Sequence, residues 1–330
     1  MNILLSLKGL AIGIAEIIPG VSGGTIAFIT GIYERLLNAI QAWNFQNISR
    51  LFKGDIKGFW KAIDGKFIFQ LGIGMLTGMV IGAFAISYLL VHYIEPLLGF
   101  FFGLILASVQ MIIRQVHKWS LKNMLFLIGG TFFALWVVMI SPTSGNLQIW
   151  YIFISGFIAI CALMLPGISG SFMLLILGMY TTILAAFKGV MTNFNFDQFF
   201  ILIVFGFGLI LGAATFSRVI SWTLKKFHQQ TLMALTGFMI GSLWKIWPWR
   251  IPATWLNKIT NEIESDRAVL ETLSKSDYKI ISEEVVFPQD YFVDHPKIAL
   301  TITTLAFGFF LVISLDYYFS KRQNKEVISQ

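Results

Sequence analysis

Long apolar stretches, separated by short polar connections, make up most of the chain. Several windows of about 20 residues carry almost no charge, for example 67–90 and 199–218. A helix of about 20 apolar residues matches the thickness of the hydrocarbon core of a bilayer. The pattern therefore predicts an all-α polytopic membrane protein. Its single spans are expected at 67–93, 97–116, 121–141, 198–224, 231–247 and 297–319.

Two further apolar blocks, 3–40 and 149–187, are each interrupted by a glycine-rich break. The first break reads PGVSGGT at 19–25, and the second reads PGISGS at 166–171. Proline and glycine end a helix. Non-helical backbone at membrane depth is tolerated only where it is buried in protein or lines a polar cavity. We interpret each block as a re-entrant helical hairpin, with two complete spans per block as the alternative.

The two breaks belong to an internal repeat. Placing Pro19 on Pro166 gives seven identities in 15 columns. Further along, an offset of 134 residues places Gly72, Gly74 and Gly78 on Gly206, Gly208 and Gly212. Repeat 1 is expected to cover 1–141 and repeat 2 to cover 142–330, each with one hairpin and three spans. The glycines from Gly72 to Gly82 predict a small-residue face for helix packing.

The two repeats are predicted to have inverted topology. Three spans plus a block that crosses zero or two times give an odd number of crossings, so the second repeat starts on the opposite side. With both termini in the cytoplasm of the cell, the basic segments 41–66, 114–122, 225–230 and 320–325 all lie inside, as the positive-inside rule requires. Lys188 is the exception among the short loops. Inverted repeats in the cell membrane are typical of secondary transporters.

Two segments outside the spans have distinct compositions. Residues 41–66 mix aromatic residues with five basic ones, which predicts an amphipathic segment at the membrane interface. Residues 250–296 are expected to form a partly helical extracytoplasmic insertion, because 251–296 carry nine acidic residues against four basic ones. The net charge of +7 comes from basic residues beside apolar segments, so we expect bilayer lipids and no nucleic acid as partners.

The breaks carry the residue types of an anion site. Serine at each break is expected to cap the second arm, whose first N–H groups and dipole favour a negative charge. We expect the two arms to face each other and to bind a phosphate or a carboxylate. The expected binding residues are Gly20, Ser22, Gly23, Gly24, Thr25, Gly167, Ser169, Gly170 and Ser171.

Two ionisable residues lie within the apolar frame. Arg218 is a permanent cation that could neutralise a phosphate, or its side chain could extend to the membrane surface. Glu16 lies three residues before Pro19, where burial and the helix dipole disfavour a charged carboxylate, so we expect it to carry a proton. The alternative for Glu16 is structural pairing with Arg218 or with an exposed loop donor.

Other functional classes have little support in the sequence. The single Cys161 and four dispersed histidines have no ligand spacing, so no metal and no cofactor are expected. No histidine or aspartate lies in either break to activate a nucleophile, so we expect no enzymatic activity.

The doubled motif resembles that of a known family. PGVSGGTIAFITGIYERLL and its second copy LPGISGSFMLLILGMY are similar to the PopT-type polyprenyl-phosphate transporter family, and the resemblance covers essentially the whole chain. It implies transport of undecaprenyl phosphate, the lipid carrier of cell-wall assembly, from the outer to the inner leaflet. It also implies that residues 19–25 and 166–171 form the headgroup site.

Three alternatives remain open at this stage. A transporter of a small soluble anion would use the same helix ends. A lipid phosphatase would need a partnered nucleophile or a metal, and a membrane scaffold would not need the serines at all. The residue patterns indicate neither the oligomeric state nor the coupling ion.

Overall fold

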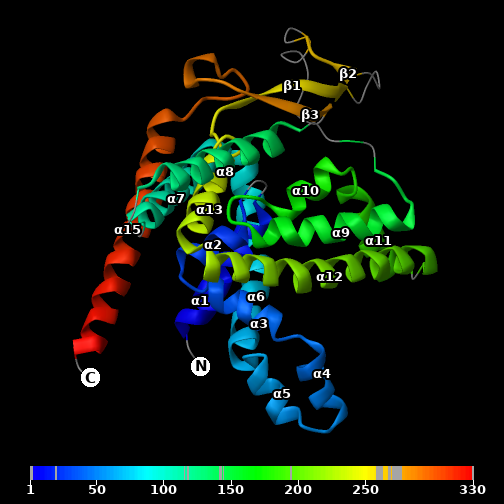
Figure 1. Ribbon diagram of the computed structural model, residues 1–330. Helices are drawn as coiled ribbons and strands as arrows, with labels where there is room; N and C mark the ends of the chain where they lie inside the picture. The colour runs from blue at the N-terminus through cyan, green and yellow to red at the C-terminus, as the bar shows by residue number, and fades with distance from the viewer. Residues whose placement is uncertain are drawn as a thin grey trace. The chain divides into compact units, whose positions relative to one another are not determined.

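A computed structural model describes residues 3–18, 21–114, 116, 119–140, 143, 145–193, 195–257, 263–266, 269 and 277–328. The chain forms two compact units, the first made of residues 1–88 and 108–243 and the second of 89–107 and 244–330. Figure 1 shows the elements in chain order. The helices are α1 (Ile3–Ile17), α2 (Gly23–Ile29), α3 (Tyr33–Gln41), α4 (Phe45–Phe52), α5 (Ile56–Ala62), α6 (Gly65–His92), α7 (Ile94–Arg114), α8 (Leu121–Met139), α9 (Ile149–Met164), α10 (Gly170–Ile176), α11 (Tyr180–Asn193), α12 (Phe196–Lys226), α13 (His228–Ser242) and α15 (Ile298–Ile328). The strands are β1 (Arg250–Asn257), β2 (Ile263–Glu264) and β3 (Tyr278–Val285), followed by the short 3-10 helix η1 (Pro288–Asp290).

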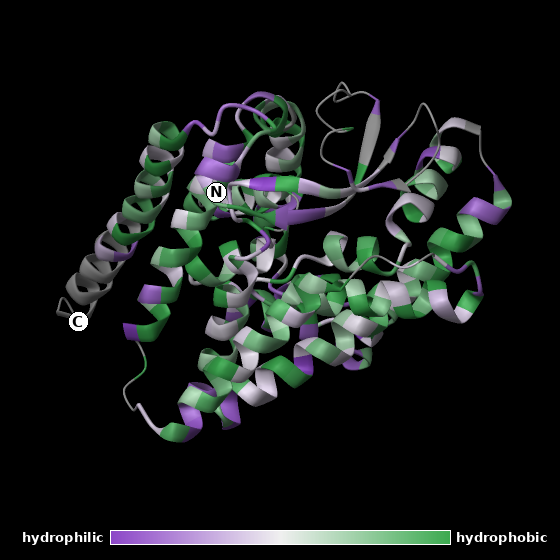
Figure 2. Cartoon of the chain, turned by 90° about the horizontal axis from the view of Figure 1, so that it is seen from above, coloured by the Kyte–Doolittle hydropathy of each residue, from purple (hydrophilic) through white to green (hydrophobic). Residues whose placement is uncertain are grey.

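Among the residues that the structure describes, four helices are long and apolar enough to cross a membrane: α6, α7, α8 and α12. They confirm four of the predicted spans, and the protein is a mostly helical, multi-pass membrane protein. In Figure 2 the helices are mostly green, and the hydrophilic colours gather in connections and strands.

One of the two remaining predicted spans differs in length from the expectation. Helix α15 covers the predicted 297–319 from residue 298 onward, and its described apolar part is Ile298–Ser314. The predicted span 231–247 falls on α13, which has 15 residues and ends at Ser242, so it extends only about 22 Å. The chain turns at 243–246, directly before the Trp-Pro-Trp sequence at 247–249, because proline restricts the preceding residue and cannot continue a helix.

The two broken blocks have the same local structure. Helices α2 and α10 cover equivalent residues at the offset of 147, and both end at a glycine with positive φ, 70° at Gly31 and 66° at Gly178. In each case the next amide donates back into the helix, from Ile32 N to Ala27 O at 3.0 Å and from Met179 N to Leu174 O at 2.9 Å. This is a helix ending that glycine allows without strain. Between α10 and α11 the axis bends by 108°, as in a broken span or a re-entrant loop.

The glycine face also recurs between the repeats. Added Cβ atoms at Gly74 and Gly78 would lie 2.2 Å from Ser6 O and 2.1 Å from Leu10 O of α1, and those at the equivalent Gly208 and Gly212 of α12 would meet the backbone or side chains of α9. Helices α9 and α12 therefore run side by side at close backbone distance (Figure 1). The predicted packing face is confirmed at Gly74, Gly78 and Gly82. Gly72 does not belong to it, because nothing lies within 4 Å of its added Cβ.

We expect Gly78→Ala to destabilise the protein by about 1–3 kcal/mol, because the new methyl group would force two helix backbones apart. The matched control is Gly72→Ala on the same helix, where the space is open and alanine favours the helix. Thermal unfolding in detergent measures both variants. Equal melting temperatures for the two variants would contradict the close crossing of α1 and α6.

The remaining long helices pair between the predicted repeats. An added Cβ at Gly103 of α7 would lie 2.0 Å from Leu305 O of α15, and one at the equivalent Gly237 of α13 would lie 2.2 Å from Leu127 O of α8. A helix of each repeat thus packs on a helix of the other. This exchange explains why the two compact units do not follow the repeat boundaries. The inverted orientation of the repeats stays a prediction.

The described part of the insertion 250–296 is mainly β-structure, with η1 and Val269 as its helical residues. It forms an antiparallel sheet in the order β2-β1-β3, with Trp255 opposite Ile280 and Glu264. Ile251 and Trp255 are 1% and 0% exposed and lie an even number of residues apart, so they share one buried face. The acidic composition predicts an extramembrane segment, which stays a prediction, and the two-residue alternation indicates the strand. The fold class is therefore helical except for this sheet.

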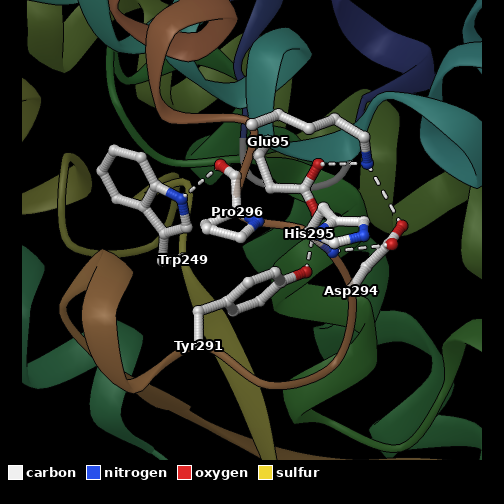
Figure 3. A network of polar contacts seen from close by, with 7 residues as sticks. Glu95, Trp249, Tyr291, Asp294, His295 and Pro296 are labelled. Carbon is white, nitrogen blue, oxygen red and sulfur yellow. Dashed lines mark hydrogen bonds and ion pairs between the residues drawn. The ribbon is translucent and has the colours of Figure 1, made fainter.

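A polar network joins the sheet's connection to the start of α7 within the second unit (Figure 3). Glu95 is fully buried, and its carboxylate accepts a hydrogen bond from Tyr291 Oη at 2.6 Å and one from Lys297 Nζ at 3.2 Å. Lys297 also lies 3.1 Å from Asp294. Burial alone lowers the pKa of Lys297, but the hydrogen bonds to Asp294 and Glu95 outweigh it, so the pKa is raised.

We expect Glu95→Gln to lower the free energy of unfolding by about 1 kcal/mol, because the amide oxygen still accepts from Tyr291 while the charge that faces Lys297 is lost. The contribution of this charge pair is present at neutral pH and is lost as the pH rises through the raised lysine pKa. Thermal melts at neutral and strongly alkaline pH measure it. A difference between the proteins that persists at alkaline pH would contradict the role of Lys297.

Candidate functional site

In the first break, a side chain of the motif itself accepts a hydrogen bond from the start of the next helix. Helix α1 ends at Ile17 and α2 begins at Gly23, with Ser22 as the N-cap whose Oγ accepts from Gly24 N at 3.2 Å. Ser22 and Thr25 are buried, at 1% and 0% exposure. The structure therefore confirms the predicted cap. Pro19 and Gly20 lie outside the described residues.

Glu16 and Lys8 of α1 contact the two ends of α2. Glu16 Oε1 accepts from Gly23 N at 2.8 Å, and Lys8 Nζ donates to Thr30 O at 2.5 Å. A carboxylate at the amino end and an ammonium at the carboxyl end both complement the helix dipole. Glu16 thus takes a backbone partner in the break itself, and no ion pair to Arg218 is formed. The sequence argument did not find Lys8, because the pairing requires that α1 and α2 fold back on each other.

The second break is more open than the first. Ser169 is the N-cap of α10 but makes no hydrogen bond to the helix amides, and its Oγ lies 2.9 Å from Ser171 Oγ. Ser169 and Gly170 are buried, while Ser171 is partly exposed. The residue equivalent to Glu16 is Leu163, so no carboxylate is available at this end. Helices α2 and α10 are therefore alike in backbone, whereas the polar groups at their amino ends differ.

The two breaks are in direct contact, as the sequence argument expected. Thr25 Oγ1 accepts from Gly167 N at 2.8 Å, and both groups are buried. Ser22 Oγ donates to Leu165 O at 3.4 Å, so two side chains of the first motif reach the backbone at the second break. Gly167 has φ of +89°, and an added Cβ would lie 2.7 Å from Phe238 O, so only glycine fits there.

Tyr33 is a third link between the motifs that the sequence argument missed. Its hydroxyl donates to Met164 O at 2.6 Å, and the residue is 4% exposed. Tyr33 is one of the seven residues identical between the repeats, and this identity is the feature of the sequence that could have indicated its role. The equivalent Tyr180 is 41% exposed, so the pairing is made on one side only.

Arg218 makes no hydrogen bond or ion pair with the described residues of either break. It lies on the exposed side of α12 beside Val219 and Trp222, whereas its neighbour Ser217 is buried and accepts from Gln41 Nε2 at 2.9 Å. Arg218 makes no hydrogen bond or ion pair with a residue that the structure describes. It lies two turns from Lys226, about 12 Å along the helix, which favours a side chain extended to the membrane surface. Its role in binding stays a prediction.

No cluster of three or more histidine, cysteine or acidic side chains that could hold a metal occurs within the described ranges. Cys161 is a free thiol. The polar groups at the breaks are hydroxyls, backbone amides and one carboxylate. Hydroxyls and amides bind phosphate oxygens by hydrogen bonds.

Comparison with known proteins identifies related sequences. The model of the VCA0040-like family, described as undecaprenyl phosphate translocase-like, matches residues 12–263. A polyprenyl-phosphate transporter of Vibrio cholerae is 39% identical over 97% of this chain and 98% of its own length. A polyprenyl-phosphate transporter of Staphylococcus aureus is 33% identical over 73% of this chain and 85% of its own length. No solved structure matches the chain.

Proposed function

Because the chain belongs to the undecaprenyl phosphate translocase-like family, we propose that it transports polyprenyl phosphate across the cell membrane. The direction is from the outer to the inner leaflet, which returns the lipid carrier for reuse, and no bond is made or broken. Both relatives are polyprenyl-phosphate transporters by name, which supports this substrate. Both termini are in the cytoplasm in this proposal.

The phosphate headgroup binds where the two breaks meet. The observation that carries this proposal is the hydrogen bond from Gly167 N to Thr25 Oγ1, which joins two broken helices at one place. Ser169 and Ser171 of the open second break offer hydroxyl donors there. The apolar tail remains in the lipid, because a long hydrocarbon chain gains nothing by entering a polar site. Rocking of one repeat against the other exposes the site to each side in turn.

Glu16 couples this movement to protons in our proposal. Its carboxylate occupies Gly23 N, a donor of the kind that a phosphate oxygen would use. Two anions at one place repel each other, so a bound phosphate favours the protonated acid or its displacement. Proton uptake by Glu16 would then accompany binding of the headgroup.

A small soluble anion is the second candidate substrate, because hydroxyls and amides recognise a phosphate whether or not it carries a lipid tail. Proteoliposomes loaded with either polyprenyl phosphate or inorganic phosphate distinguish the two. We expect movement of the lipid and none of the free anion. Transport of inorganic phosphate alone would favour the second candidate, and release of phosphate from the lipid would indicate an enzyme.

Arg218→Ala tests the predicted role of the exposed arginine. We expect the variant to bind polyprenyl phosphate about tenfold more weakly, since a charge-assisted hydrogen bond contributes about 1.5 kcal/mol. Arg218→Lys keeps the positive charge and is the matched control. Binding to purified protein measures both, and unchanged affinity in Arg218→Ala would leave the arginine with a purely interfacial role.

A further inference from the structure

Helices α4 and α5 form a small hairpin, residues 44–63, that packs little on the rest of the first unit. Each helix has its own cap, with Asn44 Oδ1 accepting from Asn47 N at 2.9 Å and Asp55 Oδ1 accepting from Gly58 N at 2.8 Å. A turn at Gly54, with φ of +77°, joins them. Helix α4 has no buried residue. The α4–α5 hairpin is thus locally well formed, yet it keeps most of its side chains outside the protein.

One side of the hairpin is apolar and exposed. Phe45, Ile48 and Phe52 follow each other at helical spacings of three and four, and the two phenylalanines are 87% and 89% exposed. On α5, Ile56 and Trp60 lie four residues apart and are 67% and 44% exposed. A cluster of large, exposed apolar side chains is typical of a surface that contacts another protein or a membrane.

The neighbouring side of the hairpin is basic. Gln46, Arg50 and Lys53 share a face of α4, and Lys57 and Lys61 lie four residues apart on α5. All five side chains are exposed. Asp55 is the one acidic residue of 44–63, and its carboxylate lies 4.0 Å from Arg50. Four basic residues against one acidic residue leave a net charge of +3 on the hairpin.

This combination selects the occupant of the apolar side. A second copy of the chain would bring two positively charged hairpins together, and like charges repel. An anionic phospholipid surface accepts apolar side chains below the headgroups and attracts the basic ones at their level. The hairpin also leads directly into α6, one of the helices able to span a membrane. The end of a spanning helix lies at the membrane surface, so the hairpin is close to that surface.

We propose that the α4–α5 hairpin docks on the anionic phospholipid surface of the leaflet next to the start of α6. Phe45, Phe52, Ile56 and Trp60 enter the boundary between headgroups and acyl chains, and Lys53, Lys57 and Lys61 contact lipid phosphates. Helix α3 connects α2, which follows the first break, to the hairpin. Docking of the hairpin therefore keeps the carboxyl end of α3 at the membrane surface. The inference does not depend on which substrate is transported.

Site-specific fluorescence quenching tests the proposal with the full-length protein in vesicles. In a Cys161→Ala background, one variant carries Phe52→Cys on the apolar side and its matched control carries Gln46→Cys on the polar side of the same helix. Both are labelled with the same fluorophore. The vesicles contain phosphatidylcholine alone or equal parts phosphatidylcholine and phosphatidylglycerol, with a nitroxide on a shallow acyl carbon.

We expect the position 52 probe to be quenched at least about twofold more than the position 46 probe in the anionic vesicles, because only the apolar side enters the bilayer. The difference is expected to shrink in phosphatidylcholine alone, at high salt, and in the triple variant Lys53→Gln, Lys57→Gln, Lys61→Gln. Equal quenching at both positions, or quenching independent of phosphatidylglycerol, would overturn the proposal. A position 52 probe that is shielded from both lipid and water would show that a protein surface covers the apolar side. That result would also overturn the proposal.

Discussion

Replacing Glu16 with leucine, the residue at the equivalent position 163, is expected to reduce transport of polyprenyl phosphate at least about tenfold. The variant leaves Gly23 N without its acceptor, and a buried amide without a partner costs about 1–3 kcal/mol, a factor of about 5 to 150 in an equilibrium. It also removes the acid that we propose takes up the proton. Initial rates in proteoliposomes, with and without a pH gradient, measure the effect.

Glu16→Gln separates the structural role from the proton role. The amide oxygen of glutamine still accepts from Gly23 N, so we expect this variant to melt within about 1 kcal/mol of the wild type. Transport should continue but no longer respond to an imposed pH gradient, because the amide does not titrate. A variant that keeps the wild-type response would remove Glu16 from the coupling mechanism. Normal transport in Glu16→Leu would show that neither role is needed.

Thr25→Val is expected to separate the two breaks. Valine has nearly the same shape as threonine, but it has no oxygen to accept the hydrogen bond of the buried Gly167 N. The free energy of unfolding should fall by about 1–3 kcal/mol, and headgroup binding should weaken at least as much, because the two motifs are no longer held together. Thermal unfolding and binding of polyprenyl phosphate to purified protein measure the two effects.

Thr25→Ser is the matched control, since serine keeps the oxygen and loses only a methyl group. We expect it to bind the lipid phosphate as the wild type does, with a small loss of stability. Thr30→Val is a second control on the same hairpin, because Thr30 Oγ1 bonds only within its own turn, to Ile26 O and Ala27 O. If Thr25→Val bound substrate normally, the contact between the breaks would be structural only.

Local patterns were sufficient for much of this fold. Charge-free windows of bilayer length located α6, α7, α8 and α12. The repeat alignment predicted equivalent breaks, and Gly31 and Gly178 indeed end α2 and α10 with the same backbone conformation. Ser22 as a cap followed from the preference of serine for the residue before a helix. Each of these features depends on neighbours within a few residues, which the sequence shows directly.

Other features depend on partners that are far apart in the chain. Arg218 was interpreted as a site residue because of its depth in an apolar run, but which side of α12 faces the protein is decided by packing against α3 and α9. The sheet in the insertion was missed because β1 pairs with β3 across more than 20 residues. The partners of Glu16 and Thr25 are the backbone amides of Gly23 and Gly167. Almost every residue has a backbone amide, so the residue type does not show which amides lack a partner within a helix.

The sequence by itself determined that this chain is a duplicated, helical membrane protein whose two apolar blocks are broken at equivalent glycine-rich motifs. The lengths of the apolar segments and the spacing of the repeated motifs depend only on the order of residues, so they can be recognised without the folded structure. Only the tertiary structure decided that the Glu16 carboxylate accepts a hydrogen bond at the amino end of α2, that Thr25 accepts one from Gly167, and that Arg218 lies on the exposed side of α12. Those facts depend on which backbone groups remain without partners once the helices have packed, and packing is a property of the whole fold.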